Sequence, residues 1–245
     1  MLLKGCQEGK GTPRLTEVKC PKCGQWVEVF IKMGGAPGQT GTLVSTEVCA
    51  CGEIETRTIP AFCATAGYTD VPLNAWYHDA VDYVVANGIM EGVAEGIFDP
   101  NGTTTRAQLV TVLYRLEGTP EVELTEQFTD VAEGAWYAEA VAWAYANGIT
   151  TGVTETAFAP NASVTREQVV VFLARYAEFK GIDTASAYDL SDFADASSVK
   201  AYATSAFAWA VENGIINGMD GRLAPNATST RAQIATILMR FMEMG

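Results

Sequence analysis

One sequence unit occurs three times in the chain, and this repetition limits the possible folds more than any other feature. Residues 75–89 and 135–149 align without a gap, and residues 201–215 align with both, with Tyr202 in place of a tryptophan. Each copy continues through a glycine and a proline to Thr-Arg-x-Gln, always with six residues from the proline to the arginine. One such unit is too small to bury a core alone, so we expect the three to pack on each other.

Each copy is predicted to form a helix, a loop and a second helix. The first helix covers about residues 76–87 in the first copy, and a glycine follows that can close a helix end in the left-handed conformation. This glycine recurs at Gly88, Gly148 and Gly214. The second helix begins with a threonine followed three residues later by a glutamine, the spacing of a capping box. The pairs are Thr105 with Gln108, Thr165 with Gln168, and Thr230 with Gln233.

Cysteine content and charge divide the chain near residues 61–67. All six cysteines lie within residues 6–63. Residues 1–60 carry a net charge of +1 and residues 61–245 carry −14, which together give the −13 of the chain. We therefore expect a tail, a small β-rich domain, a linker and three repeats. Their predicted bounds are 1–18, 19–60, 61–67, 68–120, 121–184 and 185–245.

The composition excludes several classes of protein. A net charge of −14 over residues 61–245 repels nucleic acid and anionic membrane surfaces, so neither is an expected partner. No apolar run approaches the roughly 18 residues that a membrane span needs, so we expect no membrane insertion. The acidic residues form no recognisable acid–base motif, and we expect the chain not to be an enzyme.

The cysteines of residues 19–60 indicate a different kind of structure. Cys20-Pro-Lys-Cys23-Gly resembles a zinc knuckle, and Cys49-Ala-Cys51-Gly follows it after residues that alternate like strands. Thiolates from Cys20, Cys23, Cys49 and Cys51 would hold a structural zinc ion in a zinc-ribbon-like domain. A zinc ribbon normally has Cys-x-x-Cys twice, so the second pair departs from the pattern, and disulfide bonds are the alternative. No cofactor is expected for the repeats.

An arginine occupies the first position of each second helix, at Arg106, Arg166 and Arg231. The helix N-terminus already carries a partial positive charge, so a cation there costs roughly 0.3–1 kcal/mol. Free backbone N–H groups beside a guanidinium would form an anion site. The anion is either internal, from Asp70, Asp130 or Asp195 at the start of the repeats, or part of a ligand. Position alone favours the internal pair.

A series of short motifs recurs in order within the repeats. The first repeat contains Tyr68-Thr-Asp-Val-Pro, Ala75-Trp-Tyr, Asn87-Gly-Ile, Phe98-Asp-Pro and Thr105-Arg-Ala-Gln. The second, from Phe128-Thr-Asp-Val to Thr165-Arg-Glu-Gln, follows the series equally closely, whereas the third is looser and has Leu223 in place of phenylalanine. This series resembles the S-layer homology domain. The resemblance covers 178 of 245 residues, and three copies are the family's usual number.

The resemblance implies a mainly α fold, in which three tandem helix–loop–helix repeats form a pseudo-threefold assembly. It also implies that grooves of this assembly bind secondary cell-wall polysaccharide, often through a pyruvate-ketal carboxylate. Arg106, Arg166 and Arg231 would contact this ligand, which reverses the preference from position alone. Further expected contacts are Gly92, Gly152 and Gly218, where sugar approaches the backbone, and Trp76, Trp136 and Tyr202, which either stack on sugar faces or belong to the core. The looser third repeat would leave one groove weak or empty.

The function implied by the resemblance is non-covalent anchoring to the bacterial cell wall, at the cell surface, by multivalent binding without chemistry. No export signal is visible in the sequence, so either the chain is the C-terminal piece of a longer protein or the surface location is wrong. One alternative is a helical repeat scaffold that binds a protein partner. Another is that the cysteine-containing domain is the working part, recognising protein or nucleic acid, although its net charge of +1 disfavours nucleic acid.

Overall fold

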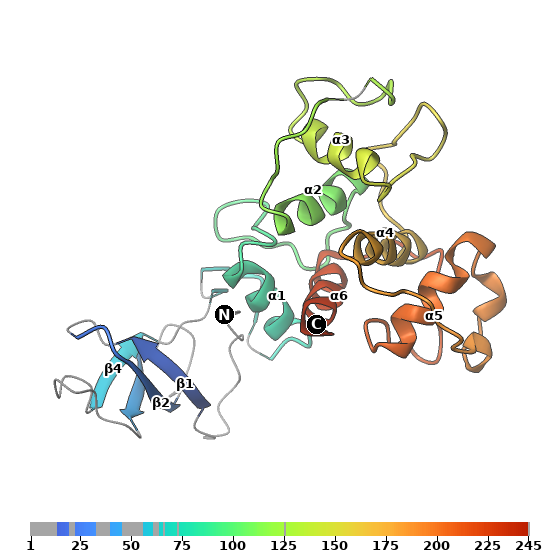
Figure 1. The fold of residues 1–245 in the computed structure, drawn as a ribbon. Helices are drawn as coiled ribbons and strands as arrows, with labels where there is room; N and C mark the ends of the chain where they lie inside the picture. Colours follow the sequence, from blue (N-terminus) through green and yellow to red (C-terminus); the bar gives the residue numbers. More distant parts are fainter. Residues whose placement is uncertain are drawn as a thin grey trace. The chain divides into compact units, whose positions relative to one another are not determined.

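A computed structural model describes residues 14–19, 23–32, 40–45, 56–60, 64–65, 67–72, 74–124 and 126–244. Within these residues, four strands precede the helices along the chain (Figure 1). The chain divides into two compact units. The first comprises Met1–Asn87 with Gly92–Phe98, and the second comprises Gly88–Glu91 with Asp99–Gly245. The border between the units therefore passes through the first repeat.

The first unit contains a four-stranded antiparallel sheet. Its strands are β1 (Arg14–Lys19), β2 (Trp26–Lys32), β3 (Thr40–Ser45) and β4 (Thr56–Pro60). Each strand pairs with the next one in the chain, so the sheet has the order β1-β2-β3-β4. Consecutive pairing of this kind needs only short connections between neighbouring strands.

The first unit also contains helix α1 (His78–Ala86) and a loop held by the segment before the helix. The backbone N–H of Thr69 donates to the carbonyl oxygen of Gly96 at 2.9 Å. The N–H of Phe98 donates to a carboxylate oxygen of Asp70 at 2.9 Å, and the N–H of Gly92 donates to the hydroxyl of Tyr68 at 3.0 Å. The Tyr-Thr-Asp motif therefore fixes the loop that follows α1.

The second unit is helical within its described residues, as the repeats predicted. Its α-helices are α2 (Arg106–Leu116), α3 (Ala138–Ala146), α4 (Arg166–Phe179), α5 (Thr204–Glu212) and α6 (Arg231–Met244). The 3-10 helices η1 (Leu190–Asp192), η2 (Ala196–Ser198) and η3 (Ala201–Ala203) precede α5. Helix α2 packs beside α3, and α4 packs beside α5 (Figure 1). The ring of Phe241 on α6 lies 5.8 Å from that of Tyr176 on α4.

The predicted helix ends are confirmed in all three repeats. The hydroxyl of each capping threonine accepts the N–H of the glutamine three residues later, and the glutamine side chain accepts the N–H of the threonine. The glycines after the first helices adopt the left-handed conformation, with φ of 66° at Gly88, 71° at Gly148 and 67° at Gly214. These local signals are sufficient to start and stop the helices.

A closed ring of backbone hydrogen bonds joins the three repeats within the second unit. Thr104 N–H donates to the Ser229 carbonyl at 3.1 Å, Ser229 N–H to the Val164 carbonyl at 3.0 Å, and Val164 N–H to the Thr104 carbonyl at 2.9 Å. These residues are the ones just before the second helices. The ring therefore gives the starts of α2, α4 and α6 a pseudo-threefold arrangement, as the resemblance implied.

An aspartate near the start of each repeat fixes the loop that precedes the second helix. In the second repeat, Asp130 accepts the N–H groups of Phe158 at 2.9 Å and Ala159 at 2.7 Å. The residue after the buried Phe158 is forced into the left-handed region, with φ of 57° at Ala159. Asp99 and Ala224 have the corresponding φ values of 59° and 51°. Such a conformation is strained for a residue with a Cβ atom.

Replacing Ala159 by glycine is expected to stabilise the protein. Glycine relieves a strain of roughly 1–2 kcal/mol and loses roughly 0.5–1 kcal/mol of chain entropy, so the free energy of unfolding should rise by about 0.5–1 kcal/mol. Ala162→Gly in the same loop is the control, because Ala162 is not among the residues with positive φ. That change should lower the free energy of unfolding by about 0.5–1 kcal/mol. Chemical denaturation measures both, and two shifts of the same sign would contradict the strain.

Candidate functional site

The three arginines at the helix starts are buried side chains. Their exposed fractions are 4% for Arg106, 4% for Arg166 and 6% for Arg231. The Nε of Arg106 donates to the Phe158 carbonyl at 2.8 Å, and the Nε of Arg166 donates to the Leu223 carbonyl at 2.9 Å. Each of these two arginines therefore reaches into the loop of the next repeat. An Nη of Arg231 donates to the Glu91 carbonyl at 2.6 Å.

The backbone N–H groups at these helix starts are not free, which corrects the expectation of a backbone anion site. The N–H groups of Arg106 and Ala107 donate to the carbonyls of Ala162 and Pro160, at 2.9 and 3.0 Å. The first two N–H groups of the other second helices are also bound by carbonyls of the next repeat. Arg166 and Glu167 donate to Ala227 and Pro225, and Arg231 and Ala232 donate to Gly102 and Pro100. Any anion bound here must therefore be held by side chains.

The internal ion pair proposed from position is also not found for two of the three arginines. Both carboxylate oxygens of Asp130 accept backbone N–H groups, and so do both oxygens of Asp195. Arg106 and Asp130 instead hold the same residue, Phe158, through its carbonyl and its N–H respectively. The aspartate still acts at a distance, because its charge favours the protonated form of Arg106.

The guanidinium of Arg106 lies between two aromatic rings. Its Cζ lies 4.8 Å from the centroid of Phe158 and 5.1 Å from that of Phe172. Its two terminal nitrogens have no hydrogen-bond partner among the described residues. Burial lowers the pKa of Arg106 to about 10, which still leaves it protonated at neutral pH. The result is a buried cation whose two terminal nitrogens each have a pair of N–H donors without a partner among the described residues.

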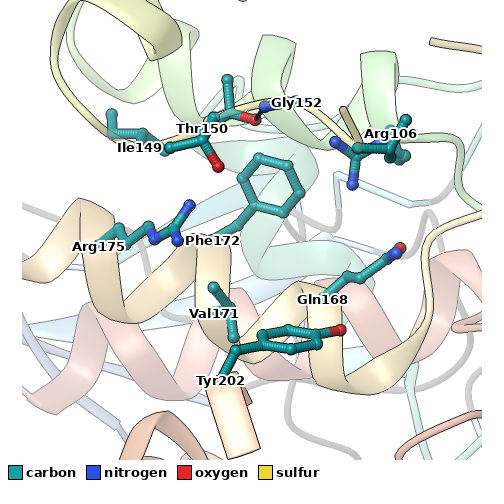
Figure 2. A pocket seen from close by; sticks show the side chains of 11 residues that line it. Arg106, Ile149, Thr150, Gly152, Gln168, Val171, Phe172, Arg175 and Tyr202 are labelled. Atoms are coloured by element: carbon teal, nitrogen blue, oxygen red, sulfur yellow. Dashed lines mark hydrogen bonds between the residues drawn. The ribbon is translucent and has the colours of Figure 1, made fainter. Parts of the chain in front are cut away.

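An open cavity of about 360 Å³ lies beside this guanidinium (Figure 2). It is formed by all three repeats, since Arg106 belongs to the first, Phe172 to the second and Tyr202 to the third. Figure 2 shows the guanidinium groups of Arg106 and Arg175 on opposite sides of the Phe172 ring. Arg175 is half-buried and has no hydrogen-bond or ion-pair partner among the described residues. The remaining lining residues are Ile149, Thr150, Thr151, Gly152, Val153, Gln168 and Val171.

Tyr202 is fixed at the cavity by a buried glutamate. Its hydroxyl donates to Glu167 Oε1 at 2.8 Å, and the ammonium group of Lys200 donates to the same oxygen. Burial and the neighbouring Glu167 raise the pKa of Tyr202 to about 12, so its hydroxyl stays neutral. Glu167 stands one residue after Arg166, near the N-terminus of α4, where the helix dipole favours an acid. The first and third repeats have Ala107 and Ala232 at this position.

The other expected sugar contacts are of two kinds: exposed aromatic side chains and glycines packed against aromatic rings. Trp76, Trp136 and Tyr202 are 68%, 66% and 52% exposed, so the alternative that they belong to the core is wrong. Of the three glycines, Gly152 lines the cavity. Packing within the protein also requires glycine at each of these three positions. A Cβ atom would lie 2.6 Å from a ring atom of Tyr68 at Gly92, 2.6 Å from Phe128 at Gly152, and 2.7 Å from Phe193 at Gly218.

Arg175 was not among the binding residues expected from the sequence, although it lines the cavity. A signal was present in the spacing. Val171, Phe172 and Arg175 lie three, four and seven residues after Gln168, which places all four on one face of α4. Gln168 was expected to cap α4, which the structure confirms, and it also borders the cavity. Phe172 is buried and borders the cavity as well.

The metal prediction falls mostly outside the described residues. Cys20, Cys49 and Cys51 are outside them, and Cys23 is exposed. The zinc site and the zinc-ribbon-like domain therefore stay predictions.

A ring of three helical repeats with a cationic cavity at their junction defines a repeat-built binding module. The chain belongs to the S-layer homology family. The family model of the S-layer homology domain matches residues 67–110, 127–170 and 192–235, one match in each repeat, which confirms the resemblance.

Several curated relatives match the same part of the chain. The surface-layer 125 kDa protein of Lysinibacillus sphaericus is 38% identical over 176 residues, which is 70% of this chain and 14% of that protein. The amylopullulanase of Thermoanaerobacterium thermosulfurigenes is 31% identical over 72% of this chain and 9% of its own length. The S-layer protein sap of Bacillus anthracis is 26% identical over 74% of this chain and 22% of its own. The chain thus spans less than a quarter of the length of these relatives.

The family supports anchoring to the cell wall and a location at the cell surface. The enzymes among the relatives match through their S-layer homology regions, which are binding modules. In the part of the chain that the structure describes, no helix is both long and apolar enough to span a membrane.

Replacing Gly152 by alanine is expected to distort the cavity wall. The new Cβ would lie 2.5 Å from the Thr154 carbonyl oxygen, and Gly152 has a φ of +83°. We expect the free energy of unfolding to fall by roughly 2–4 kcal/mol, from overpacking and backbone strain together. Gly148→Ala is the matched control, since its φ is +71° but no atom lies within 4 Å of the new Cβ. It should cost only roughly 1–2 kcal/mol. Equal losses in chemical denaturation would show that steric contact plays no part at Gly152.

Proposed function

We propose that the repeats anchor the protein non-covalently to the cell wall by binding an acidic secondary cell-wall polysaccharide, with a pyruvate-ketal carboxylate as the recognised group. The observation that carries this proposal is the guanidinium of Arg106. It is buried, held between two rings, lacks partners for its terminal nitrogens within the described residues, and borders an open cavity. A carboxylate matches the fork of two guanidinium nitrogens, and it would satisfy the charge that burial has partly desolvated.

The charge of the whole molecule makes this local arrangement necessary. The chain carries a net charge of −13, so an anionic polymer is repelled at long range and cannot adhere loosely. Attraction must come at short range, where Arg106 and Arg175 border one cavity. Such a module should bind acidic sugar only where the substituent reaches these guanidinium groups. Specificity then arises from the same residues as affinity.

The lining of the cavity suits a sugar. Thr150, Thr151 and Gln168 supply hydrogen-bonding groups, and Tyr202 supplies an aromatic ring with a neutral hydroxyl. A volume of about 360 Å³ is at the small end of ligand sites, which favours one or two sugar units over a long stretch of polymer. The arginine recurs at Arg166 and Arg231, so several weak sites on one chain can meet one repeating polymer. The avidity gain from such multivalency is on the order of 10²–10⁴.

We infer that the described module is not catalytic. The charged groups that border the cavity are arginines, and Tyr202 stays protonated because its pKa is about 12. These groups offer no base of suitable pKa for proton transfer at neutral pH. The two surface-layer relatives support a role in attachment, and the amylopullulanase shows that such repeats also accompany an enzyme.

Binding to purified cell-wall sacculi tests the proposed function. We expect co-sedimentation of the full chain with intact sacculi, and loss of it after mild acid removes the pyruvate ketals. The variant with Arg106, Arg166 and Arg231 all changed to alanine should lose binding by at least tenfold, because the loss of even one charge-assisted contact costs roughly 1.5–3 kcal/mol.

These arginines also satisfy carbonyl groups, so folding must be controlled. The corresponding triple lysine variant keeps the charges and should keep part of the binding, and circular dichroism melts check that both variants are folded. Unchanged binding by the folded alanine variant would reject the proposed contact. Binding to stripped sacculi would reject the acidic substituent and leave the protein-scaffold alternative to be tested.

A further inference from the structure

The three repeats place a second arginine beside each helix-start arginine. Arg175 borders the same cavity as Arg106. An Nη of Arg240 donates to the Ile215 carbonyl at 3.5 Å, at the loop that contains Gly218, and the charge of Arg240 also lowers the pKa of Arg166, in addition to the larger effect of burial. Arg115 and Arg231 both contact one residue, Glu91. We name these the Arg106–Arg175, Arg166–Arg240 and Arg231–Arg115 pairs. The second member is the seventh residue after the capping glutamine in each repeat.

The three pairs differ in one neighbouring loop residue. This residue stands just before the loop glycine of each repeat and is Glu91, Thr151 or Asn217. Thr151 is exposed, lines the cavity with Arg175, and carries no charge. Asn217 is also exposed and neutral. Only the first repeat has an acid at this position.

Glu91 contacts both arginines of the Arg231–Arg115 pair. Its carboxylate oxygen lies 3.4 Å from an Nη of Arg115, and its main-chain carbonyl accepts an Nη of Arg231 at 2.6 Å. The Glu91 side chain is 71% exposed, so it presents a negative charge to an approaching ligand. The two arginines and Glu91 together therefore carry a net charge of +1. The other two pairs keep two positive charges each at the same repeat position.

We propose that the residue before the loop glycine determines which arginine pairs accept an acidic sugar, a conclusion that rests on the proposed function. Thr151 and Asn217 leave Arg175 and Arg240 available as second contacts for a ligand whose carboxylate is held by Arg106 or Arg166. Glu91 neutralises Arg115 and repels the carboxylate, so the Arg231–Arg115 pair does not bind it. The weak site is thus set by an acid in the first repeat, and not by the looser sequence of the third.

The proposal assigns Arg175 a direct role in specificity. It shares the cavity with Arg106 but lies on the other side of the Phe172 ring (Figure 2). A sugar carboxylate at Arg106 therefore leaves Arg175 for a second oxygen of the same saccharide, such as a hydroxyl or an amide carbonyl. A ligand that reaches both guanidinium groups is bound more tightly than one that carries the carboxylate alone.

Titration calorimetry on the full chain tests the proposal. The probe is a synthetic hexosamine methyl glycoside carrying a pyruvate ketal, with the same glycoside lacking the ketal as the negative probe. We expect two bound ketals per wild-type chain, one for Thr151→Glu and three for Glu91→Thr. Binding of the purified polysaccharide should weaken by about tenfold or more in Thr151→Glu, because one of two linked sites is lost.

Ala187→Glu is the matched control for charge. It adds the same negative charge at an exposed position of the linker before η1, away from the cavity lining. This variant should bind as the wild type does. Thr151 and Glu91 are both exposed, so neither change removes a core contact, and melting curves confirm that the variants fold.

The outcomes separate the two proposals. If the wild type binds the ketal but Thr151→Glu binds as Ala187→Glu does, the loop-residue proposal is overturned and the proposed function stands. The same holds if Glu91→Thr gains no site. If the wild type binds neither the glycoside nor the polysaccharide, the proposed function itself is overturned, and the loop-residue proposal falls with it.

Discussion

The ring of hydrogen bonds between Thr104, Val164 and Ser229 is the constraint on which the helical unit depends. Each of these residues stands just before a second helix, so the ring fixes where α2, α4 and α6 begin. The helix starts then give their first two N–H groups to carbonyls of the next repeat. Backbone donors at a helix start must find partners, and here a neighbouring repeat supplies them. No repeat can satisfy these groups alone, so each repeat depends on a neighbour.

The same hydrogen bonds determine how the molecule can recognise an anion. A free helix start would bind one through its backbone N–H groups, but here those groups are used for assembly. In the proposed function, charge recognition falls to the arginine side chain that extends from the same position. Its Nε is used to hold the neighbouring loop, and its terminal nitrogens remain for the cavity. Under the proposed function, assembly and binding use different atoms of one residue, and a change at Arg106 affects both.

Much of the fold could be predicted from local sequence signals, and much of the site could not. The capping boxes and left-handed glycines depend on residues within a few positions of each other, so the sequence located the helix ends well. The cavity depends on which side chains of different repeats meet. Arg175 was not expected at the site, and Asp130 was a candidate partner of an arginine, because nothing local indicates that both Asp130 and Arg106 hold Phe158. The exposure of Trp136 was equally open, since an aromatic near a helix start suits a core or a surface.

The ring closes the third repeat onto the first, since Arg231 donates to Gly102 and Ala232 to Pro100. The three seams between repeats are therefore alike, although only two of them also have a covalent connection. Deleting any one repeat would break two seams and leave a pair joined along a single edge. Sequence order within the module matters less than cyclic order. A circularly permuted chain opened in the linker at residues 181–189 would retain all three seams, provided that its old termini were joined by a segment long enough to span them.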